Sequence, residues 1–500
     1  MLEAFKSISL KKSSGSPLYS QLYDRLKQMV EAGILLPDMK LPSVRSMAEI
    51  LGINQITVVT AFKQLENEGF VYKKPGSGTF VSDIVMKSAE KAESSSSPLH
   101  DELYPQEDPT SISSEMISLD QNTINFASAT PTPDLFPVDN FKLALNEVLE
   151  RDKGNAFSYQ DSHGYLPLRE SVSGLLKNSD LEFSLDNIQI ISGAQQGLDL
   201  ISKALLRQGD HIITESPTYT GAIALFKSRG ARILDVQMDT DGPDLSLLDY
   251  NLKQYRPRII YTIPSFQNPT GRSYSMEKRL AVLELAELYN CYIIEDDYVS
   301  DLDFEGRGYK PLKILDKYNR VIFIKSFSKI FMPGLRLGFM IVPSVLTENL
   351  LAAKHITDIS TSGLIQRAFD LYIRKGYWDK HFNFMYKIYK ERYEKSTQAL
   401  SRCLGSNFSF TEPGGGLNLW LGLPYGFPAN TLIKHAADHN IVFAPGRIFY
   451  SGNAPQTLNN IRLSFAAVYT EQIEAGIEKL CYLMNQLQNA DLSRRNVPIL

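Results

Sequence analysis

The sequence predicts a multidomain chain with a small N-terminal unit, mainly α-helical with a β-hairpin, and a large α/β unit with a mostly parallel sheet. Three observations support this. The chain has 500 residues, which is too long for a single hydrophobic core. Its first 83 residues contain three short amphipathic segments followed by two strand-like runs. After residue 119, short apolar runs alternate with helical patterns, which is typical of a sheet covered by helices on both faces.

Composition and charge exclude several classes of protein. The net charge of −4 excludes a uniformly basic coat for nucleic acid, although local basic patches are compatible with it. The N-terminus lacks the apolar core of a signal peptide, and no run is long enough to cross a bilayer, so we expect a cytoplasmic protein with no membrane partner. Cys291, Cys403 and Cys481 are odd in number and far apart in the sequence, so we expect no metal and no disulfide framework.

The small unit begins with two helices that have clear start and stop signals. Ser16-Pro17 supplies a capping hydroxyl and a proline at the first turn, and Gly33 ends that helix. Ser43 caps the second helix and Gly52 ends it. Both segments repeat apolar residues at helical spacing, which predicts one buried face on each helix.

A third helix follows almost immediately and leads into a hairpin. Asn54 is its predicted cap and Gly69 its end. Two short helices joined by a tight turn containing glycine are typical of a helix-turn-helix. Strand-like runs over 70–72 and 79–81 flank a basic, glycine-rich tip and complete a winged helix-turn-helix over residues 1–83. The predicted apolar face of the third helix consists of Val58, Ala61, Phe62 and Leu65.

The placement of polar residues indicates DNA binding more clearly than net charge does. Residues 1–83 contain ten Lys and Arg against eight Asp and Glu, and a small helical domain that binds another protein remains an alternative. In a major groove, the start of the third helix would meet base edges, and the wing lysines would meet phosphates. The candidate DNA-binding residues are Arg45, Asn54, Gln55, Thr57, Lys63, Lys73 and Lys74.

The segment LPSVRSMAEILGINQITVVTAFKQLENEGFVYKKPGSGTFV resembles the GntR-type winged helix along its full length. The resemblance implies double-stranded operator DNA as a partner, and Arg45 matches the arginine that this family uses against DNA. Gln55 departs from the arginine that many members carry next to a serine. Because glutamine prefers adenine edges and arginine prefers guanine, the base preference of the family is not transferred to this chain.

Residues 84–118 differ in composition from both flanking units. They contain a serine run at 94–97, three prolines, and two lysines against seven acidic residues. Such a composition predicts a flexible, acidic Ser/Pro linker. The alternative is a surface loop that belongs to the next domain.

In the body, residues 119–500, polar clusters follow the predicted strands. Strand-like runs at 188–191, 211–214, 259–263, 292–294 and 321–324 each lead into such a cluster. Ligands of parallel sheets bind beyond the C-terminal ends of the strands. The predicted topology would bring all five clusters to the same edge of the sheet. We therefore interpret them as one binding site and not as five separate solvated loops.

The residue types in these clusters suit pyridoxal phosphate. Lys329, in VIFIKSFSKIFMPGLRLGF, would form a Schiff base with it, because burial and the nearby cation Arg336 favour loss of the lysine proton. Arg336 would hold the phosphate as a planar two-donor fork. Asp296 would pair with the protonated ring nitrogen and keep the ring an electron sink.

The other candidate residues indicate a cofactor site less strongly when each is considered alone. Asn268 and Tyr298 would hydrogen-bond the phenolic oxygen of the ring, and Tyr219 would stack on the ring face. The turn at Gly193 precedes a helix, whose N-terminus favours a phosphate. An ordinary turn, a solvated acidic pair and a core tyrosine are the structural alternatives for these residues.

In this order the motifs resemble the fold-type I, class I aminotransferases, from about Ile124 to Ala466. SGAQQG, NPTG, EDDY, SFSK with its arginine, and NIRLSFA carry the resemblance. It implies a three-layer α/β domain with a smaller α+β C-terminal subdomain from about residue 390. Tyr159 would reach the phosphate of the neighbouring subunit, and Arg462 would hold a substrate or effector carboxylate. The residues implied around the phosphate are Gly193, Ala194, Gln195, Ser326, Ser328 and Arg336.

A GntR-type head joined by a linker to an aminotransferase-like body resembles the MocR subfamily of transcription regulators, whose body acts mainly as an effector sensor and dimerisation unit. The resemblance implies a homodimer that responds to an amino compound or to pyridoxal phosphate itself. One alternative is a catalytically active aminotransferase that carries a DNA-binding head. Another is a scaffold without cofactor, against which the retained Lys329, Asp296 and Arg336 argue.

Overall fold

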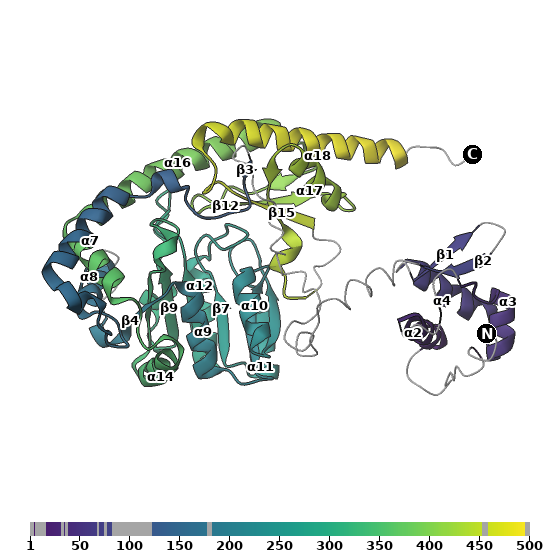
Figure 1. Ribbon diagram of the computed structural model, residues 1–500, viewed down its shortest axis with the longest axis horizontal. Coiled ribbons are helices and arrows are strands. Elements are labelled where there is room, and N and C mark those ends of the chain that lie inside the picture. Colours follow the sequence, from purple (N-terminus) through teal and green to yellow (C-terminus); the bar gives the residue numbers. More distant parts are fainter. Residues whose placement is uncertain are drawn as a thin grey trace. The chain divides into compact units, whose positions relative to one another are not determined.

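The computed structural model of the chain describes residues 5, 17–31, 35, 39–67, 70–74, 78–82, 123–177, 183–452 and 459–495 (Figure 1). The chain divides into two compact units, residues 1–108 and 109–500. The segment interpreted as a linker, 84–118, lies outside the described residues, so its character stays a prediction. We refer to the first unit as the head and to the second as the body.

The head contains the predicted order of elements. Its helices are α2 (Leu18–Glu31), α3 (Val44–Leu51) and α4 (Gln55–Asn67). Ser43 Oγ accepts a hydrogen bond from the Ser46 N–H at 3.1 Å, and Gly52 ends α3 in the left-handed conformation. Asn54 Oδ1 accepts from the Ile56 N–H at 2.9 Å and caps α4. The other predicted signals, Ser16, Gly33 and Gly69, lie outside the described residues.

The core of the head forms where α2 and α4 meet. The whole predicted apolar face of α4 is buried, and it packs with Leu22 and Leu26 of α2. The wing is an antiparallel hairpin of β1 (Val71–Lys74) and β2 (Gly78–Val81), in register from Val71–Val81 to Lys74–Gly78. The winged helix-turn-helix prediction is therefore confirmed.

A seven-stranded sheet forms the centre of the body. Its order is β4-β10-β9-β8-β7-β5-β6, and only β10 runs antiparallel to its neighbours. Five strands correspond to predicted runs, whereas β6, in which apolar and polar residues are mixed, and β10 were not predicted. The strands are β4 (Ile188–Ile191), β5 (His211–Ser216), β6 (Arg232–Gln237), β7 (Ile259–Thr262), β8 (Tyr292–Asp297), β9 (Val321–Ser326) and β10 (Gly338–Ile341).

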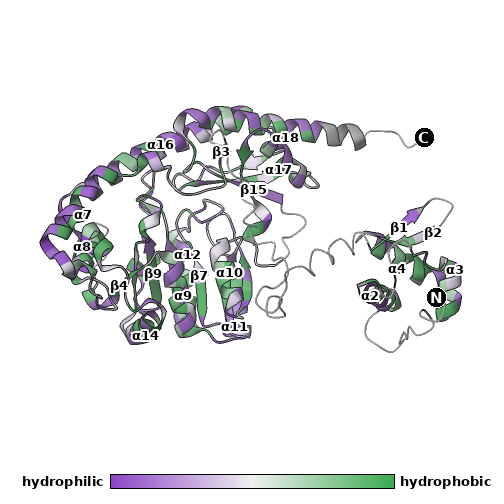
Figure 2. Cartoon of the chain, in the orientation of Figure 1, coloured by the Kyte–Doolittle hydropathy of each residue, from purple (hydrophilic) through white to green (hydrophobic). Residues whose placement is uncertain are grey.

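Both faces of this sheet are buried by helices. The neighbouring strand residues Ile293 and Ile294 belong to different hydrophobic clusters, because consecutive side chains point to opposite faces. Helices α9 (Ala194–Leu205) and α10 (Thr220–Ser228) contribute to one cluster, and α11 (Leu245–Tyr255) and α12 (Met276–Leu288) contribute to the other. The strands are accordingly hydrophobic over most of their length (Figure 2). This arrangement confirms the three-layer prediction.

Further helices also belong to the core of the body. They are α7 (Val138–Asp152), α8 (Leu166–Lys177), α14 (Thr347–Asp358) and α15 (Gly363–Arg374), which all contribute buried residues to the larger cluster. The short α13 (Leu312–Leu315) contributes Leu312 to the smaller cluster.

A second, antiparallel sheet lies toward the C-terminus, with the order β11-β12-β15-β14. A separate parallel pair joins β13 to β3, so the start of the body returns to this part of the fold. Residue 390, the expected start of the subdomain, falls inside the 27-residue α16. The elements are β3 (Ile124–Asn125), α16 (Tyr377–Cys403), β11 (Ser409–Phe410), β12 (Asn418–Leu423), α17 (Ala429–Asp438), β13 (Ile441–Val442), β14 (Ala444–Pro445), β15 (Asn459–Ser464) and α18 (Ile473–Arg495).

The cysteines require a correction. Cys403 of α16 and Cys481 of α18 form a disulfide, with Cα atoms 5.9 Å apart, whereas Cys291 is free and buried. The expectation of no disulfide was wrong for this pair, because two helices that are distant in the sequence lie side by side. None of the described helices is long and apolar enough to cross a membrane.

Candidate functional site

The C-terminal ends of the parallel strands bring the predicted cofactor residues together. Asp296 lies at the end of β8, and Lys329 follows β9 in a turn. Gly193 follows β4 and caps α9, and Tyr219 precedes α10 after β5. The charges of Asp296, Arg336 and Arg462 all act on the Lys329 amine, so these groups share one site.

The surroundings of Lys329 favour the neutral, nucleophilic form of its amine. Burial and the positive charges of Arg462 and Arg336 lower its pKa to about 8, although Asp296 opposes this shift. The backbone of the turn is fixed, because the Tyr389 hydroxyl donates to the Lys329 carbonyl oxygen at 2.8 Å. A lysine amine with such a pKa is partly neutral near pH 7 and can attack an aldehyde.

Asp296 is buried with one carboxylate oxygen unpartnered. Its side chain is 4% exposed, and Oδ2 accepts from the Tyr261 hydroxyl at 2.8 Å. Oδ1 has no hydrogen-bond partner. Burial, reinforced by the charge of Asp297, raises the pKa of Asp296 to about 6, against the hydrogen bond from Tyr261 and the charge of Lys329. A buried acceptor is costly without a donor, so this oxygen fits a positively charged ring nitrogen.

Gly193 and Arg336 form a cradle that suits a phosphate. A Cβ atom on Gly193 would lie 2.6 Å from Arg336 Nη2, so the absence of a side chain lets the guanidinium lie against the turn. Arg336 has φ of 51° and donates from Nη2 to the Ser192 carbonyl oxygen at 3.1 Å. Helix α9 begins at Ala194, and its first N–H groups favour an anion.

Two further predicted residues are Ser326, the last residue of β9, and Ser328, in the turn that follows. Ser328 is 8% exposed, and its Oγ is buried without a partner. The Ser328 N–H donates to Ser326 Oγ at 3.2 Å. An unpartnered buried hydroxyl fits a phosphate oxygen, which accepts hydrogen bonds.

Tyr219 and Gln195 lie at the other side of the site. The Tyr219 hydroxyl donates to Gln195 Oε1 at 3.4 Å, and Gln195 Nε2 donates to the Gly221 carbonyl oxygen at 3.0 Å. Burial and Asp296 raise the pKa of Tyr219, so the phenol stays neutral. A Cβ on Gly221 would lie 2.5 Å from the Tyr219 ring, which explains the glycine at this position.

Arg462 and Asn268 lie together across the two sheets. Arg462, on β15, donates from Nη1 to Asn268 Oδ1 at 3.0 Å and from Nη2 to the Ala127 carbonyl oxygen. Its Nε is buried without a partner, and its guanidinium carbon lies 5.0 Å from the Phe449 ring centre. Burial lowers the pKa of Arg462 to about 10. The second sheet therefore contributes a cation to a site that is otherwise built on the first.

Two predicted site residues have less direct support. The Tyr298 hydroxyl donates to the Phe266 carbonyl oxygen at 2.6 Å and accepts from Asn418 Nδ2 at 3.0 Å, so its proton is not directed at a ring oxygen. Tyr159 is 81% exposed. An exposed tyrosine suits a contact with a neighbouring subunit, and that contact stays a prediction.

Sequence reasoning did not identify Tyr261, Asn418 and Tyr389. Tyr261 lies within the apolar strand β7, where nothing in the sequence distinguishes it from a core residue. Asn418 and Tyr389 come from β12 and α16, far along the chain from the motifs they contact. Only their position after folding indicates a role.

In the head, the predicted DNA-binding residues lie mainly on the surface. Asn54, Gln55 and Lys63 are exposed and Thr57 is half-buried, whereas the side chain of Lys74 is not described. Arg45 pairs with Glu49 at 3.3 Å, with its side chain 81% exposed. Lys73 pairs with Glu66.

Helix α4 also presents two apolar residues to solvent. Ile56 is 72% exposed and Val59 is 49% exposed. Sequence reasoning missed them because it considered only polar side chains as candidates for DNA contacts. Apolar side chains at these positions suit the methyl groups of thymine.

Comparisons with known proteins agree with this division into head and body. The family model described as aminotransferase class I and II matches residues 114–480. The model described as bacterial regulatory proteins, gntR family, matches residues 18–81.

Two relatives match along nearly the whole chain. The uncharacterized HTH-type transcriptional regulator YisV of Bacillus subtilis (strain 168) is 31% identical over 93% of this chain and 96% of that protein. The probable rhizopine catabolism regulatory protein MocR of Rhizobium meliloti is 28% identical over 94% of each protein.

A solved structure matches the body. LysN, an α-aminoadipate aminotransferase from Thermus thermophilus complexed with N-(5'-phosphopyridoxyl)-L-leucine, is 32% identical with a TM-score of 0.69. The match covers 74% of this chain and 94% of that one.

Proposed function

This chain belongs to the aminotransferase class I and II family and, through its GntR-type head, to the MocR subfamily of regulators, and we propose that its body senses an amino compound or pyridoxal phosphate itself. It is a DNA-binding regulator with a body that binds pyridoxal phosphate. The sensing step, the residues that perform it and the assembly into a cytoplasmic homodimer are part of the proposal.

The observation that carries the assignment of residues is the unpartnered Oδ1 of Asp296. A buried carboxylate oxygen without a donor, in the same site as a lysine of lowered pKa, fits one ligand with a cationic ring nitrogen and an aldehyde. When bound, pyridoxal phosphate supplies an electrophilic aldehyde and a ring that accepts electrons. Asp296 holds the ring nitrogen, Lys329 provides the amine, and Arg336 and Ser328 bind the phosphate.

Each of these residues has a distinct task. With a pKa of about 8, about a tenth of Lys329 is neutral at pH 7, which is enough for attack on a carbonyl carbon. Asp296, with a pKa of about 6, is mostly ionised at that pH. Asn268, held by Arg462, keeps its amide N–H groups for a ring oxygen.

Arg462 gives the body a means of responding to an effector. Its Nε lacks a partner, and a carboxylate bound there would satisfy it. Because Arg462 belongs to the second sheet and Lys329 to the first, an amino acid that engages both would favour one arrangement of the two sheets. An effector shifts an equilibrium only by its difference in affinity for two states, and this bridging contact provides such a difference.

On the DNA side, we assign α4 to the major groove. Asn54, Gln55 and Thr57 would face base edges, with Ile56 and Val59 against thymine methyl groups. Glutamine suits adenine, so the same helix favours A·T base pairs. Arg45, Lys63, Lys73 and Lys74 would contact phosphates, and Arg45 and Lys73 would exchange their carboxylate partners for them.

A second function, transamination, is favoured by the intact set of site residues. Spectral titration with amino acids and a steady-state transamination assay distinguish the two. The regulator proposal predicts a change in the cofactor absorbance with one class of amino compound, without sustained turnover when a keto acid is added. Sustained turnover with no effect of the same compound on DNA affinity would instead identify an enzyme.

A further inference from the structure

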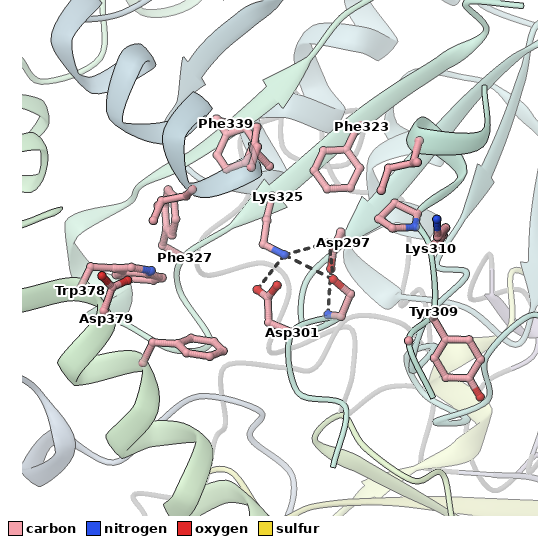
Figure 3. A pocket seen from close by; sticks show the side chains of 17 residues that line it. Asp297, Asp301, Tyr309, Lys310, Phe323, Lys325, Phe327, Phe339, Trp378 and Asp379 are labelled. Carbon is pink, nitrogen blue, oxygen red and sulfur yellow. Dashed lines mark hydrogen bonds and ion pairs between the residues drawn. The ribbon is translucent and has the colours of Figure 1, made fainter. Parts of the chain in front are cut away.

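A second cavity lies behind the cofactor site, on the opposite face of β8 and β9. Its volume is about 400 Å³, which is within the range of small-molecule sites. Asp296 and Asp297 are consecutive on β8, so their side chains point to opposite faces of the sheet. Asp297 lines the cavity, together with Lys325, its partner in register on β9 (Figure 3). We call this space the rear cavity.

A linked group of three charges forms one side of the rear cavity. Lys325 Nζ lies 2.9 Å from Asp297 Oδ2 and 2.8 Å from Asp301 Oδ2. Burial alone would lower the pKa of Lys325, but the two carboxylates raise it above its ordinary value, so the ammonium stays charged. Removing charges such as Lys325 and Asp297 from water rarely stabilises a fold better than apolar residues would, which makes a binding role reasonable.

More negatively charged than positively charged side chains line the rear cavity. Asp379 also lines it, on the first turn of α16, and the described residues provide no ion pair for this carboxylate. Asp301 is 33% exposed at its side chain, so part of its carboxylate is accessible. With Lys310 at the far side, the cavity contains three carboxylates and two ammonium groups (Figure 3).

Aromatic side chains line the rear cavity together with Asp379. Phe327 and Trp378 pack edge to face with their ring centres 5.2 Å apart, and Phe382 lies on the next turn of α16. Aromatic faces attract cations and also bury apolar groups. Carboxylates and aromatic rings at one end of a cavity form a combination that recognises organic ammonium ions.

We propose that the rear cavity binds a small organic cation with an apolar, ring-sized body, held by Asp301 and Asp379 and packed against Trp378 and Phe327. An anionic ligand would face an excess of carboxylates, and a neutral one would leave them without a new partner. The site is distinct from the cofactor site, which takes up the other face of the same two strands.

The rear cavity is connected to the cofactor residues in two ways. An occupant that engages Asp301 leaves Asp297 as the remaining partner of Lys325, and Asp297 is adjacent to Asp296 in the chain. Helix α16 carries Trp378 and Asp379 in its first turn, and further along it the Tyr389 hydroxyl donates to the Lys329 carbonyl oxygen. Binding in the cavity is therefore expected to alter the environment of bound pyridoxal phosphate.

The test uses benzyltrimethylammonium chloride and the full-length protein loaded with pyridoxal phosphate. A quaternary nitrogen cannot react with an aldehyde, so this probe does not compete for the chemistry of Lys329. Calorimetry should show one site per chain, together with a change in tryptophan fluorescence that Trp378→Phe removes. The double substitution Asp301→Asn and Asp379→Asn should weaken binding at least tenfold.

Controls separate the alternatives. Asp139→Asn removes a carboxylate from the first turn of another long helix, α7, and should leave affinity unchanged. Asp379→Asn alone changes only an exposed residue and should also weaken binding, so the test does not depend on folding of the double variant. Lys329→Ala should retain binding of the probe. Wild-type affinity in both the Asp379→Asn and the double variant, tighter binding of 3-phenylpropionate or of benzyl alcohol, or loss of binding in Lys329→Ala would each overturn the proposal.

Discussion

In the body, Asp296 and Arg462 of the cofactor site are buried and each has a polar atom without a partner, whereas in the head Arg45 and Lys73 are exposed and already paired. Asp296 is 4% exposed with a free carboxylate oxygen, while the Arg45 side chain is 81% exposed and bound to Glu49. A buried, unsatisfied group is suited to one ligand of matching geometry. An exposed pair is worth about 0–1 kcal/mol, so it can exchange its carboxylate for a phosphate at little cost. The body should therefore bind its ligand specifically. The head should bind many DNA sequences with affinities that differ moderately and that depend on salt concentration.

The largest effect is expected at Lys329. Lys329→Ala should abolish the cofactor's absorbance band that depends on the covalent bond, because Lys329 is the lysine whose amine shares the site with Asp296 and Arg336. Absorbance spectra of purified protein measure this. Lys203→Ala, which changes a lysine on α9 outside the site, is the control. An unchanged band in Lys329→Ala would mean that the site is elsewhere.

The phosphate cradle should be almost as sensitive. In Gly193→Ala the new methyl group would lie 2.6 Å from Arg336 Nη2, at a backbone position with φ of 83°. Cofactor affinity should fall by a factor on the order of 30, which corresponds to losing a charge-assisted hydrogen bond of about 2 kcal/mol. Fluorescence titration with pyridoxal phosphate provides the measurement. Gly154→Ala, at an open position, should have no effect.

The capture of pyridoxal phosphate should depend on pH. The folded protein lowers the pKa of Lys329 to about 8, and only the neutral amine reacts, so capture becomes faster as pH rises through 8. The neutral fraction increases from about a tenth at pH 7 to about nine tenths at pH 9, which predicts about a ninefold increase in rate. Stopped-flow absorbance follows this reaction. A profile that is flat between pH 7 and 9 would contradict the assigned environment of the lysine.

The head should respond to smaller changes, in two distinguishable ways. Lys73→Ala removes a phosphate contact, so it should weaken all DNA sequences alike and reduce the slope of log affinity against log salt by about one. Fluorescence anisotropy on operator and random duplexes at several salt concentrations tests this. A loss confined to the operator would assign Lys73 to base recognition instead.

Replacing thymine by uracil beneath α4 should have the smallest effect. Uracil lacks only the methyl group, and burying one such group is worth about 0.8 kcal/mol, or roughly fourfold in affinity. Ile56→Ala should make the protein insensitive to the replacement, because Ile56 is the most exposed of the large apolar residues described on α4. If uracil weakens binding equally in wild type and Ile56→Ala, the methyl contact belongs to another residue.

How far the sequence predicted these sites depended on where each residue lies relative to a strand. Lys329, Asp296 and Gly193 lie within a few residues after apolar runs, so topology alone brings them to one edge of the sheet. Tyr261 was not predictable, because a tyrosine in an apolar strand resembles any core residue.

Contacts between distant parts of the chain were also beyond sequence reasoning. The Cys403–Cys481 bond and the contact of Asn418 with Tyr298 depend on how α16, α18 and the second sheet pack. Lys325 was not singled out in the sequence, where a lone lysine resembles an ordinary surface residue, although it lines the rear cavity. Patterns among neighbouring residues of the sequence do not reveal contacts between distant parts of the chain.

The most direct test of communication between body and head is DNA affinity measured during titration with an effector amino acid, in wild type and Lys329→Ala, both supplied with pyridoxal phosphate. The effector is the compound that changes the cofactor spectrum. We predict that wild-type affinity changes over the same concentration range as the spectrum, because linked equilibria must shift together, and that Lys329→Ala binds DNA with an affinity that the amino acid does not alter. An identical response in both proteins would contradict a sensing role for the lysine site.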